Sequence, residues 1–324
     1  MKKRVPQGKK NEKQTGKASC FQLVEKRIAH FKDSRKLKTA NNYACALKHF
    51  RDFRANKDLA IGDLSAGLMR DFQSYLTEKG LTMNTISLYN RSLRAVYNYA
   101  LDEGILTTDK RPFRKVFTGL EKTRKRALDS EVAQDLVQLS FPNDEKTAFA
   151  RDLFLFSLYM QGMPFVDIAH LTKKQLQGNH IAYQRRKTNQ SLKVYVHALA
   201  NAIIKRYRVK DPDCPYLFPI LYDPKRKRTI LYSSALRTYN RRLARVARLV
   251  GLDEPLTSYV SRHTWASLAR QSGVADNVIC EAMGHNNVST TMIYLTSLDT
   301  GTVAAANRKV IATLTTPREP IRET

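Results

Sequence analysis

Residues 261–295 read SRHTWASLARQSGVADNVICEAMGHNNVSTTMIYL. Most of this stretch is typical of amphipathic helix, but four polar positions interrupt that pattern. Arg262 and His263 are adjacent, and His285 follows a glycine. Tyr294 comes nine residues after His285. The rest of the sequence indicates which chemistry these four side chains could serve.

The composition predicts a globular, strongly cationic protein. The chain has 324 residues, 42% of them hydrophobic, with a formal net charge of +27. That length is enough for two domains with separate cores. A charge this high favours an anionic partner, and nucleic acid is the commonest one. A membrane surface is the alternative, but no apolar run is long enough to span a bilayer, and the polar N-terminus is unlike a secretion signal. We therefore expect a cytoplasmic protein with no membrane partner.

The cysteines give no indication of a disulfide framework or a zinc site. Cys20, Cys45, Cys214 and Cys280 lie far apart in the chain, and no pair has C-x-x-C spacing. We expect them to be buried thiols in a reducing compartment.

Changes in periodicity divide the chain into segments. Four successive apolar stripes at helical spacing predict a first helical domain, with Gly80 and Gly104 where helices should end. Periodicity is then lost in a stretch containing Pro112 and Gly119 and many cations, which is typical of a linker. The predicted organisation is a basic flexible tail at 1–17, a helical DNA-binding domain at 18–104, a linker at 105–127, a catalytic domain at 128–298, and a docking helix and tail at 299–324.

The outer faces of the first helical domain carry donors suited to DNA. Arginine, lysine and asparagine reach both phosphates and base edges. The alternative is an ordinary solvated face. The candidate DNA-binding residues are Lys48, Arg51, Asn84, Asn90, Arg91 and Arg94.

The second domain is predicted to be helical with one interruption. The runs HIAYQRR (180–186) and LKVYVHA (192–198) alternate apolar and polar residues and are separated by KTNQS. This pattern predicts a β-hairpin. The expected fold class is mainly α with a small β-hairpin or sheet, in two domains.

The singled-out side chains suit transesterification at a phosphodiester. Arg262 offers a planar fork for two phosphate oxygens, and His285 can donate a hydrogen bond. The Tyr294 hydroxyl becomes a nucleophile if its proton is removed. Lys187, in the predicted hairpin turn, could protonate a leaving oxygen. We find no carboxylate cluster to hold a metal, so no cofactor is expected.

The order of these residues resembles the tyrosine recombinase (phage integrase) family. SRHTWASLA resembles its second-arginine box, AMGHNNVSTTMIYL its histidine-to-tyrosine box, and RRKTNQSLKVYV its lysine hairpin. The four predicted helices resemble its core-binding (SAM-like) domain. The resemblance covers roughly residues 20 to 312.

The resemblance implies a site-specific recombinase acting on double-stranded DNA. Members cut DNA, form a 3′-phosphotyrosine and rejoin the strand to a new 5′ hydroxyl, which integrates, excises or inverts a segment. It implies four copies on two paired sites, with accessory DNA-bending proteins as further partners and association with the nucleoid when DNA is bound. By position, Tyr294 is the nucleophile, Arg262 the second catalytic arginine and His285 the phosphate donor. Lys187 is the general acid, and His263 is a supporting residue.

Two positions depart from the family pattern. Tyr259 stands where a histidine usually precedes the second arginine, and its phenol can still donate a hydrogen bond. The first-arginine box reads QGMPFVD, with Pro164 in place of arginine and Asp167 as the acid. Candidate substitutes are Arg151, Arg185 and Arg186; Arg185 is preferred because strand alternation puts it on the same face as Lys187. This version of the box resembles integrases and invertases from mobile elements of anaerobic gut bacteria.

Three other functions remain open at this point. Pro164 favours a DNA-binding protein of the same fold with impaired catalysis. A type IB topoisomerase shares the nucleophile chemistry but nicks and reseals one duplex. A basic structural or ribosome-associated protein would explain the charge and leave the spacing of the four residues to coincidence.

Overall fold

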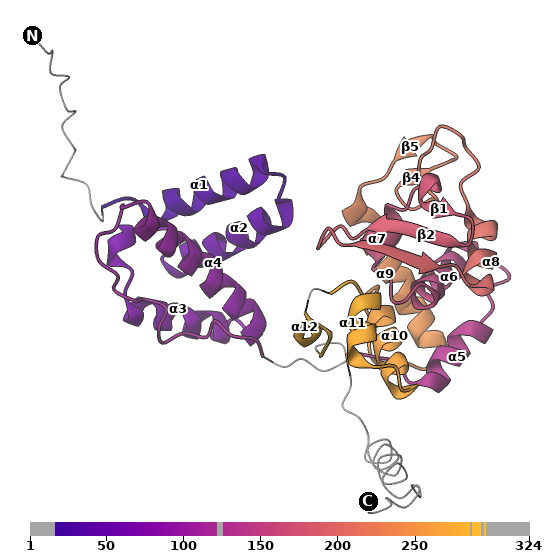
Figure 1. Ribbon diagram of the computed structural model, residues 1–324. Helices are drawn as coiled ribbons and strands as arrows, with labels where there is room; N and C mark the ends of the chain where they lie inside the picture. The colour runs from indigo at the N-terminus through magenta and orange to yellow at the C-terminus, as the bar shows by residue number, and fades with distance from the viewer. Residues whose placement is uncertain (1–16, 122–125, 286, 293–294, 296–324) are drawn as a thin grey trace, which may run out of the picture. The chain divides into compact units, whose positions relative to one another are not determined.

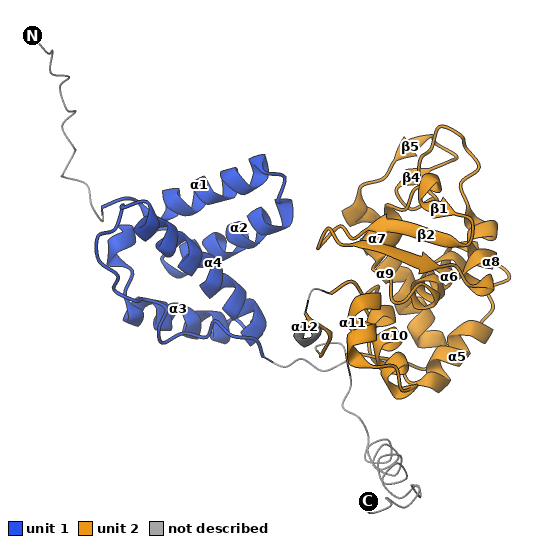
Figure 2. Ribbon diagram, in the orientation of Figure 1, with its two compact units in different colours: residues 1–123 blue, residues 124–324 orange. Residues whose placement is uncertain are grey.

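The computed structural model describes residues 17–121, 126–285, 287–292 and 295, in two compact units (Figures 1 and 2). The first unit comprises residues 1–123 and the second residues 124–324. Among the described residues, no helix combines the length and apolar character needed to cross a membrane. The predicted tail and the predicted C-terminal docking helix lie outside the described residues, except for Lys17.

The first unit is helical, as the periodicity predicts. Its elements are α1 (Cys20–Asp33), α2 (Leu37–Phe53), the 3-10 helix η1 (Ile61–Asp63), α3 (Ala66–Glu78) and α4 (Met83–Asp102). Ser19, Ser65 and Thr82 cap α1, α3 and α4 by accepting a backbone N–H, which satisfies a donor that the helix itself leaves unpaired. Gly80 and Gly104 follow α3 and α4 with φ of 74° and 69°, so both predicted helix ends are confirmed.

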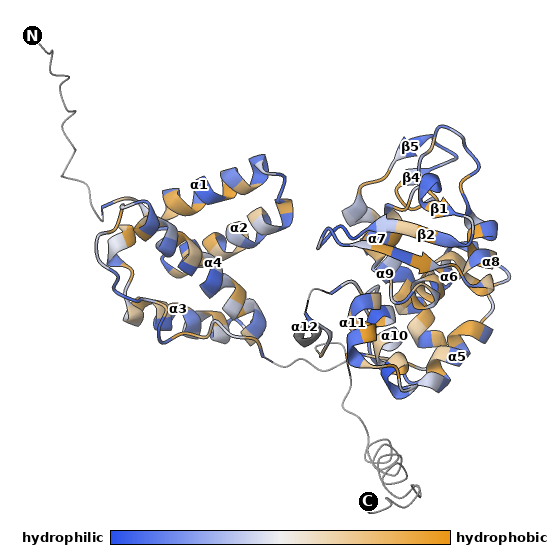
Figure 3. Ribbon diagram, in the orientation of Figure 1, coloured by the Kyte–Doolittle hydropathy of each residue, from blue (hydrophilic) through white to orange (hydrophobic). Residues whose placement is uncertain are grey.

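Much of the predicted linker is part of the first unit's core. Leu106, Phe113 and Val116 are buried in the same hydrophobic cluster as α1 to α4. The loss of helical period therefore marks an irregular segment packed on the helices, and the prediction that the linker begins at residue 105 is wrong. Figure 3 shows hydrophobic and hydrophilic residues interspersed along these helices.

The second unit is mixed but mainly helical. Its helices are α5 (Ser130–Gln138), α6 (Glu145–Tyr159), α7 (Phe165–Ala169), η2 (Lys173–Gln175), α8 (Ala198–Tyr207), α9 (Tyr232–Leu249), α10 (Val260–Gln271), α11 (Asp276–Ala282) and α12 (Val288–Met292). Its strands are β1 (Leu176–Gln177), β2 (His180–Gln184), β3 (Ser191–Tyr195), β4 (Tyr222–Asp223) and β5 (Arg228–Thr229).

Helix α6 lies at the centre of this unit. It contacts α5, α8, α9 and α10, and its buried residues are on all sides of the helix. A helix that is apolar all round needs such neighbours on every face. Because α6 ends at Tyr159, its C-terminal end brings the following turn against α10.

The predicted hairpin is confirmed. β2 and β3 pair antiparallel from His180 opposite Tyr195 to Gln184 opposite Ser191, and the short β1 adds a third strand beside β2. The turn between β2 and β3 closes through Arg185, whose N–H donates to the Gln190 carbonyl at 2.8 Å. The sequence did not predict β1 or the pair β4 and β5, which are only two residues long each.

Candidate active site

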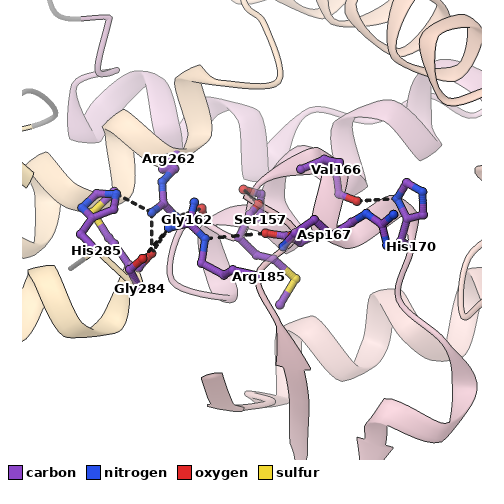
Figure 4. A network of polar contacts seen from close by, with 12 residues as sticks. Ser157, Gly162, Val166, Asp167, His170, Arg185, Arg262, Gly284 and His285 are labelled. Atoms are coloured by element: carbon purple, nitrogen blue, oxygen red, sulfur yellow. Dashed lines mark hydrogen bonds and ion pairs between the residues drawn. The ribbon is translucent and has the colours of Figure 1, made fainter. Parts of the chain in front are cut away.

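Five segments of the second unit converge on one polar network (Figure 4). They are the turn after α6, α7, the turn of the β2–β3 hairpin, α10, and the loop from α11 into α12. A buried hydrogen bond of 2.8 Å between the hydroxyls of Ser157 and Ser261 joins α6 to α10 beside it. The network thus draws on residues separated by about a hundred positions in the chain.

Arg262 is at the centre of the network and is only 2% exposed. Its Nη1 donates to the Gly162 carbonyl at 2.9 Å, and its Nη2 lies 2.5 Å from the Met283 carbonyl and 2.8 Å from His285 Nε2. A buried guanidinium must be hydrogen-bonded to offset its desolvation, and these contacts do so while fixing its plane. Arg262 is therefore held rigidly before any substrate arrives.

Gly162 is required beside this arginine. Its φ is 68°, in the region that glycine tolerates, and a Cβ there would lie 3.1 Å from the Arg262 Cα. Because that neighbour is backbone, it cannot move aside at low cost. The glycine of the first-arginine box thus allows the turn after α6 to touch α10.

Arg185 enters the same network from the hairpin turn. It is 4% exposed, and its Nη1 donates to the Met283 carbonyl at 2.9 Å and to the Gly284 carbonyl at 2.6 Å. Arg185 and Arg262 therefore share the Met283 carbonyl as an acceptor. Gly284 has φ of 63°, and a Cβ there would lie 2.7 Å from the Arg185 Cδ. The two guanidiniums thus lie close together at the end of α11.

Asp167 is the carboxylate that faces this pair of cations. It is buried, its Oδ2 lies 3.8 Å from Arg185 Nε, and its Oδ1 accepts the backbone N–H of Arg186 at 3.0 Å. Burial raises the pKa of Asp167, while the Arg186 N–H and the guanidiniums of Arg185 and Arg262 oppose that rise. Asp167 therefore helps to orient Arg185.

Pro164 begins α7 and takes no part in the cationic network. It is the N-cap residue, with φ of −61°, and its carbonyl accepts the N–H groups of Asp167 and Ile168. Proline suits this position because its ring fixes φ near that value. The residue at the expected place of the first arginine therefore has a purely backbone role.

His285 is buried between Arg262 and α12. Its Nε2 lies 2.8 Å from Arg262 Nη2, and its Nδ1 lies 2.9 Å from the Thr291 hydroxyl. Burial, followed by the charges of Arg262, Arg185 and Lys187, lowers the pKa of His285 to about 3. The imidazole is thus neutral near pH 7, and it can hold or give a hydrogen bond without carrying charge.

Lys187, His263 and Tyr259 lie around this buried centre. Lys187 is exposed in the hairpin turn, and its positive charge contributes to the lowered pKa of His285. His263 is half-buried on α10, and its ring makes an edge contact with Tyr259, 5.1 Å between centroids. Tyr259 is 47% exposed at the start of α10. Tyr294 lies outside the described residues.

The other two candidates for the missing arginine have different positions. Arg151 donates to the carbonyls of Leu136, Val137 and Leu139 at the end of α5, and it pairs with Asp152 at 2.6 Å. Arg186 is exposed and contacts Asp167 through its backbone. Of the three candidates, only Arg185 has its guanidinium in the network with Arg262. The prediction that Arg185 and Lys187 share a strand face is wrong, because β2 ends at Gln184 and Arg185 is in the turn.

The polar candidates of the first unit have mixed positions. Lys48 is exposed, Arg91 is half-buried, and Arg51 pairs with Glu25 at 2.7 Å. Asn84 exchanges two 2.9 Å hydrogen bonds with the Glu121 backbone, and Arg94 donates to Thr118 at 3.2 Å.

Asn90 corrects the prediction of DNA contact. Its side chain is fully buried, and its Nδ2 donates to the Phe117 carbonyl at 3.1 Å and to Gln73 Oε1 at 3.3 Å. A fully buried amide does not reach a phosphate. Asn90 therefore holds the irregular segment after α4 against the helix.

Two features of the second unit were missed by the sequence reasoning. Thr291 contacts His285, and the only signal in the sequence is its place three residues before Tyr294. Helix α9 carries five arginines and no acidic residue: Arg237, Arg241, Arg242, Arg245 and Arg248. That run was visible in the sequence as a basic amphipathic helix.

Two sequence profiles match most of the chain. Residues 19–116 match the profile described as Phage integrase SAM-like domain, and residues 126–300 match the one described as Phage integrase family. The division between the two matches falls near the division between the two units.

Relatives of similar length also match. A tyrosine recombinase of Pseudothermotoga lettingae is 24% identical over 277 residues, which cover 82% of this chain and 90% of the relative. Tyrosine recombinase XerC of Rickettsia canadensis is 24% identical over 284 residues, covering 85% of this chain and 88% of the relative.

Solved structures of the same fold have been determined with DNA. The Tn1549 transposon integrase bound to circular intermediate DNA has a TM-score of 0.66 at 17% identity, covering 89% of this chain and 99% of that chain. A lambda integrase tetramer bound to a Holliday junction also has a TM-score of 0.66, at 16% identity, covering 86% of this chain and 78% of that chain.

Proposed function

Because this chain belongs to the phage integrase family of tyrosine recombinases, we propose that it cuts and rejoins DNA at specific sites through a 3′-phosphotyrosine at Tyr294. The Tyr294 oxygen attacks phosphorus, and the 5′ oxygen of the cut strand leaves. A 5′ hydroxyl of the partner duplex later attacks the phosphotyrosine and releases Tyr294. The number of phosphodiester bonds is unchanged, so no energy source is consumed.

The observation that carries this proposal is the pair of buried guanidiniums beside a neutral histidine. Negative charge on the non-bridging oxygens grows as the tyrosine attacks, and donors fixed in advance stabilise that charge without reorganising. Arg262 and Arg185 are both buried and share the Met283 carbonyl, and His285 contacts Arg262. Such an arrangement is unusual for a DNA-binding protein without catalysis, since buried cations cost stability there for no chemical gain.

Arg185 takes the role of the missing first arginine in this proposal. It is next to the second arginine, it is buried, and Asp167, the acid of the first-arginine box, orients it. A guanidinium reaching the site from the hairpin turn can replace one that would start at position 164, because the phosphate interacts with the guanidinium and not with the backbone carrying it. Pro164 is then compatible with an active enzyme.

The residues around the centre have the remaining roles. Lys187 protonates the leaving 5′ oxygen, for which a mobile ammonium in a turn is suited. His263 and Tyr259 support the second arginine from α10. Leu295, which is buried against Ala266, Ile279 and Met283, supports delivery of Tyr294 by its own chain, because it follows the tyrosine directly.

DNA binding by the second unit is supported by α9. Arg237, Arg241, Arg245 and Arg248 are exposed and recur at helical spacing, opposite the buried Tyr239, Leu243 and Val246. Only one ion pair of this face, Arg245 with Asp144 at 2.9 Å, is present among the described residues. Phosphate neutralisation by such a face is consistent with the cationic character of the chain, and makes affinity fall steeply with salt.

Assembly on two sites is part of the same proposal. The reaction needs two duplexes and a cut in each strand, which favours four copies with a docking role for residues 299–324. Accessory DNA-bending proteins and association with the nucleoid belong to this proposal as well.

A covalent-capture experiment tests the function. The protein is incubated with nicked duplexes whose core sequence is randomised, so that the short fragment beyond the cut diffuses away and traps the phosphotyrosine. We expect a detergent-resistant adduct, an enriched core sequence, and a modified peptide containing Tyr294. Tyr294→Phe should bind the enriched duplex as tightly as wild type and give no adduct. An adduct on another tyrosine, or none with wild type, contradicts the proposal.

A further inference from the structure

We propose that Thr291 is a positioning residue whose hydroxyl lets His285 change tautomer when the scissile phosphate binds. This inference rests on the proposed function, because it names what prepares His285 for that phosphate. It concerns a buried hydroxyl that none of the reaction steps above uses.

The contacts of His285 define its tautomer in this structure. A guanidinium has donors only, so Arg262 Nη2 donates to His285 Nε2 across 2.8 Å. Nε2 therefore has no proton. The proton of the neutral ring is on Nδ1, which donates to the Thr291 hydroxyl at 2.9 Å. His285 is 7% exposed and Thr291 is fully buried, so both contacts are shielded from water.

The reaction needs the other tautomer. The non-bridging oxygens of a phosphodiester only accept hydrogen bonds, so a histidine that contacts them must present an N–H. If Nε2 turns from Arg262 to the phosphate, it needs the proton and Nδ1 must become an acceptor. The exchange takes place when the ring turns away from Arg262 and its buried contacts open to water: Nε2 then takes one proton from water and the Nδ1 proton is released to water, so the ring stays neutral.

Thr291 fits both states because a hydroxyl can accept and donate. It accepts the Nδ1–H before the phosphate binds, and its own O–H can rotate to donate to Nδ1 afterwards. A backbone carbonyl or a carboxylate in this place would fix the first tautomer. Full protonation of the ring is opposed by its burial and by the neighbouring cations, which lower the pKa of His285.

The position of Thr291 links this change to the nucleophile. Thr291 lies on α12, three residues before Tyr294 in the sequence. The hydrogen bond therefore ties the imidazole to the segment that carries the tyrosine. The competing explanation is that Thr291 only fills space in the core.

Two substitutions separate these explanations. Thr291→Val keeps the volume and removes the hydroxyl, whereas Thr291→Ser keeps the hydroxyl and removes a methyl. The matched control is Thr290→Val on the same helix, where the threonine is exposed. Single-turnover adduct formation is measured on the nicked duplex recovered by covalent capture, and thermal unfolding reports folding.

We expect Thr291→Val to cleave at least tenfold more slowly than wild type, and Thr291→Ser within about threefold of it. Thr290→Val should match wild type, and all variants should bind the duplex equally. If Thr291 only fills space, Thr291→Val should cleave faster than Thr291→Ser, because valine keeps the volume. That result would overturn the inference. Absence of an adduct with wild type would instead count against the proposed function.

Nitrogen-15 chemical shifts of His285 test the tautomer without cleavage. The Tyr294→Phe protein is labelled at histidine and observed with and without the same duplex, and His285 is assigned by its loss in His285→Gln. We expect the Nδ1–H form in the free protein and the Nε2–H form with DNA, and no change of tautomer in the Thr291→Val background. The same tautomer with and without DNA would overturn the inference.

Discussion

The two units both bury polar side chains against backbone carbonyls, but with different consequences. In the first unit, Asn90 is buried with neutral partners and fixes the segment around Phe117. In the second unit, Arg262 and Arg185 are buried as cations on the Met283 carbonyl, and Arg262 also contacts His285. A neutral amide bonded to a carbonyl contributes stability, whereas two adjacent buried cations add a positive field that an anionic substrate can use. Burial of polar groups alone thus does not mark a site; the kind of group and its convergence do.

The largest expected effect comes from removing one cation of the second unit. Arg185→Ala should lower single-turnover cleavage by about a hundredfold, since losing one fixed donor to a developing oxyanion costs about 3 kcal/mol. DNA affinity should change little. Arg151→Ala is the matched control, because Arg151, on α6, is also partly buried and donates to backbone carbonyls, but these carbonyls belong to the end of α5 and not to the network around Arg262. It should lower the melting temperature and leave the cleavage rate of folded protein unchanged. Equal losses of cleavage in both variants would remove the distinction between the two arginines.

A smaller effect is expected where the glycine beside Arg185 is replaced. Gly284→Ala adds a Cβ 2.7 Å from the Arg185 Cδ at φ of 63°, so the guanidinium must shift. Cleavage should fall about tenfold, and stability by about 1–2 kcal/mol. Gly251→Ala has the same backbone cost at φ of 67° but meets no atom within 4 Å. Gly251→Ala should therefore lower the free energy of unfolding and leave the cleavage rate unchanged. If it also lowers the cleavage rate, backbone strain and not the position of Arg185 governs that rate.

The neutral histidine makes the second unit sensitive to acid. The pKa of His285 is lowered to about 3 in the folded protein, mainly by burial, against about 6.5 in the unfolded chain. The unfolded state therefore binds a proton first as pH falls, and stability is lost between about pH 6.5 and pH 3, by up to about 1.4 kcal/mol per pH unit. Denaturant unfolding at pH 7 and pH 5 should show a smaller loss in His285→Asn than in wild type. Equal losses would mean that other groups cause the acid sensitivity.

The smallest effect on chemistry is expected in the first unit. Asn90→Ala removes the hydrogen bonds to Phe117 and Gln73, and should lower the free energy of unfolding by about 1–2 kcal/mol. Cleavage by the folded fraction should be unchanged. Asn98→Ala, at an exposed position of the same helix, should alter stability by less than about 0.5 kcal/mol. If fully folded Asn90→Ala protein cleaves more slowly than wild type, the first unit contributes to the cleavage reaction.

Local sequence patterns were sufficient to predict the helices of the first unit and the hairpin, but not to predict where the linker begins. The helical stripes of the first unit and the alternation around Lys187 predicted α1 to α4 and the hairpin, because period and turn residues are local properties. The segment after Gly104 has no period, so its buried Leu106 and Phe113 could not be told from loop residues. The burial of Asn90 could not be predicted for a related reason: on α4 it lies beside the apolar stripe, and only the segment packed over it decides that it is buried.

The sequence by itself determined the family and the fold class, and it predicted the order of the candidate catalytic residues: Lys187, Arg262, His285 and Tyr294. These follow from residue types at short spacings. Only the tertiary structure decided that the guanidinium of Arg185, and not that of Arg151 or Arg186, lies beside Arg262, and that Thr291 contacts His285. The direction of a long side chain depends on packing between segments far apart in the chain, such as Arg185 against Met283, and no local pattern encodes such a contact.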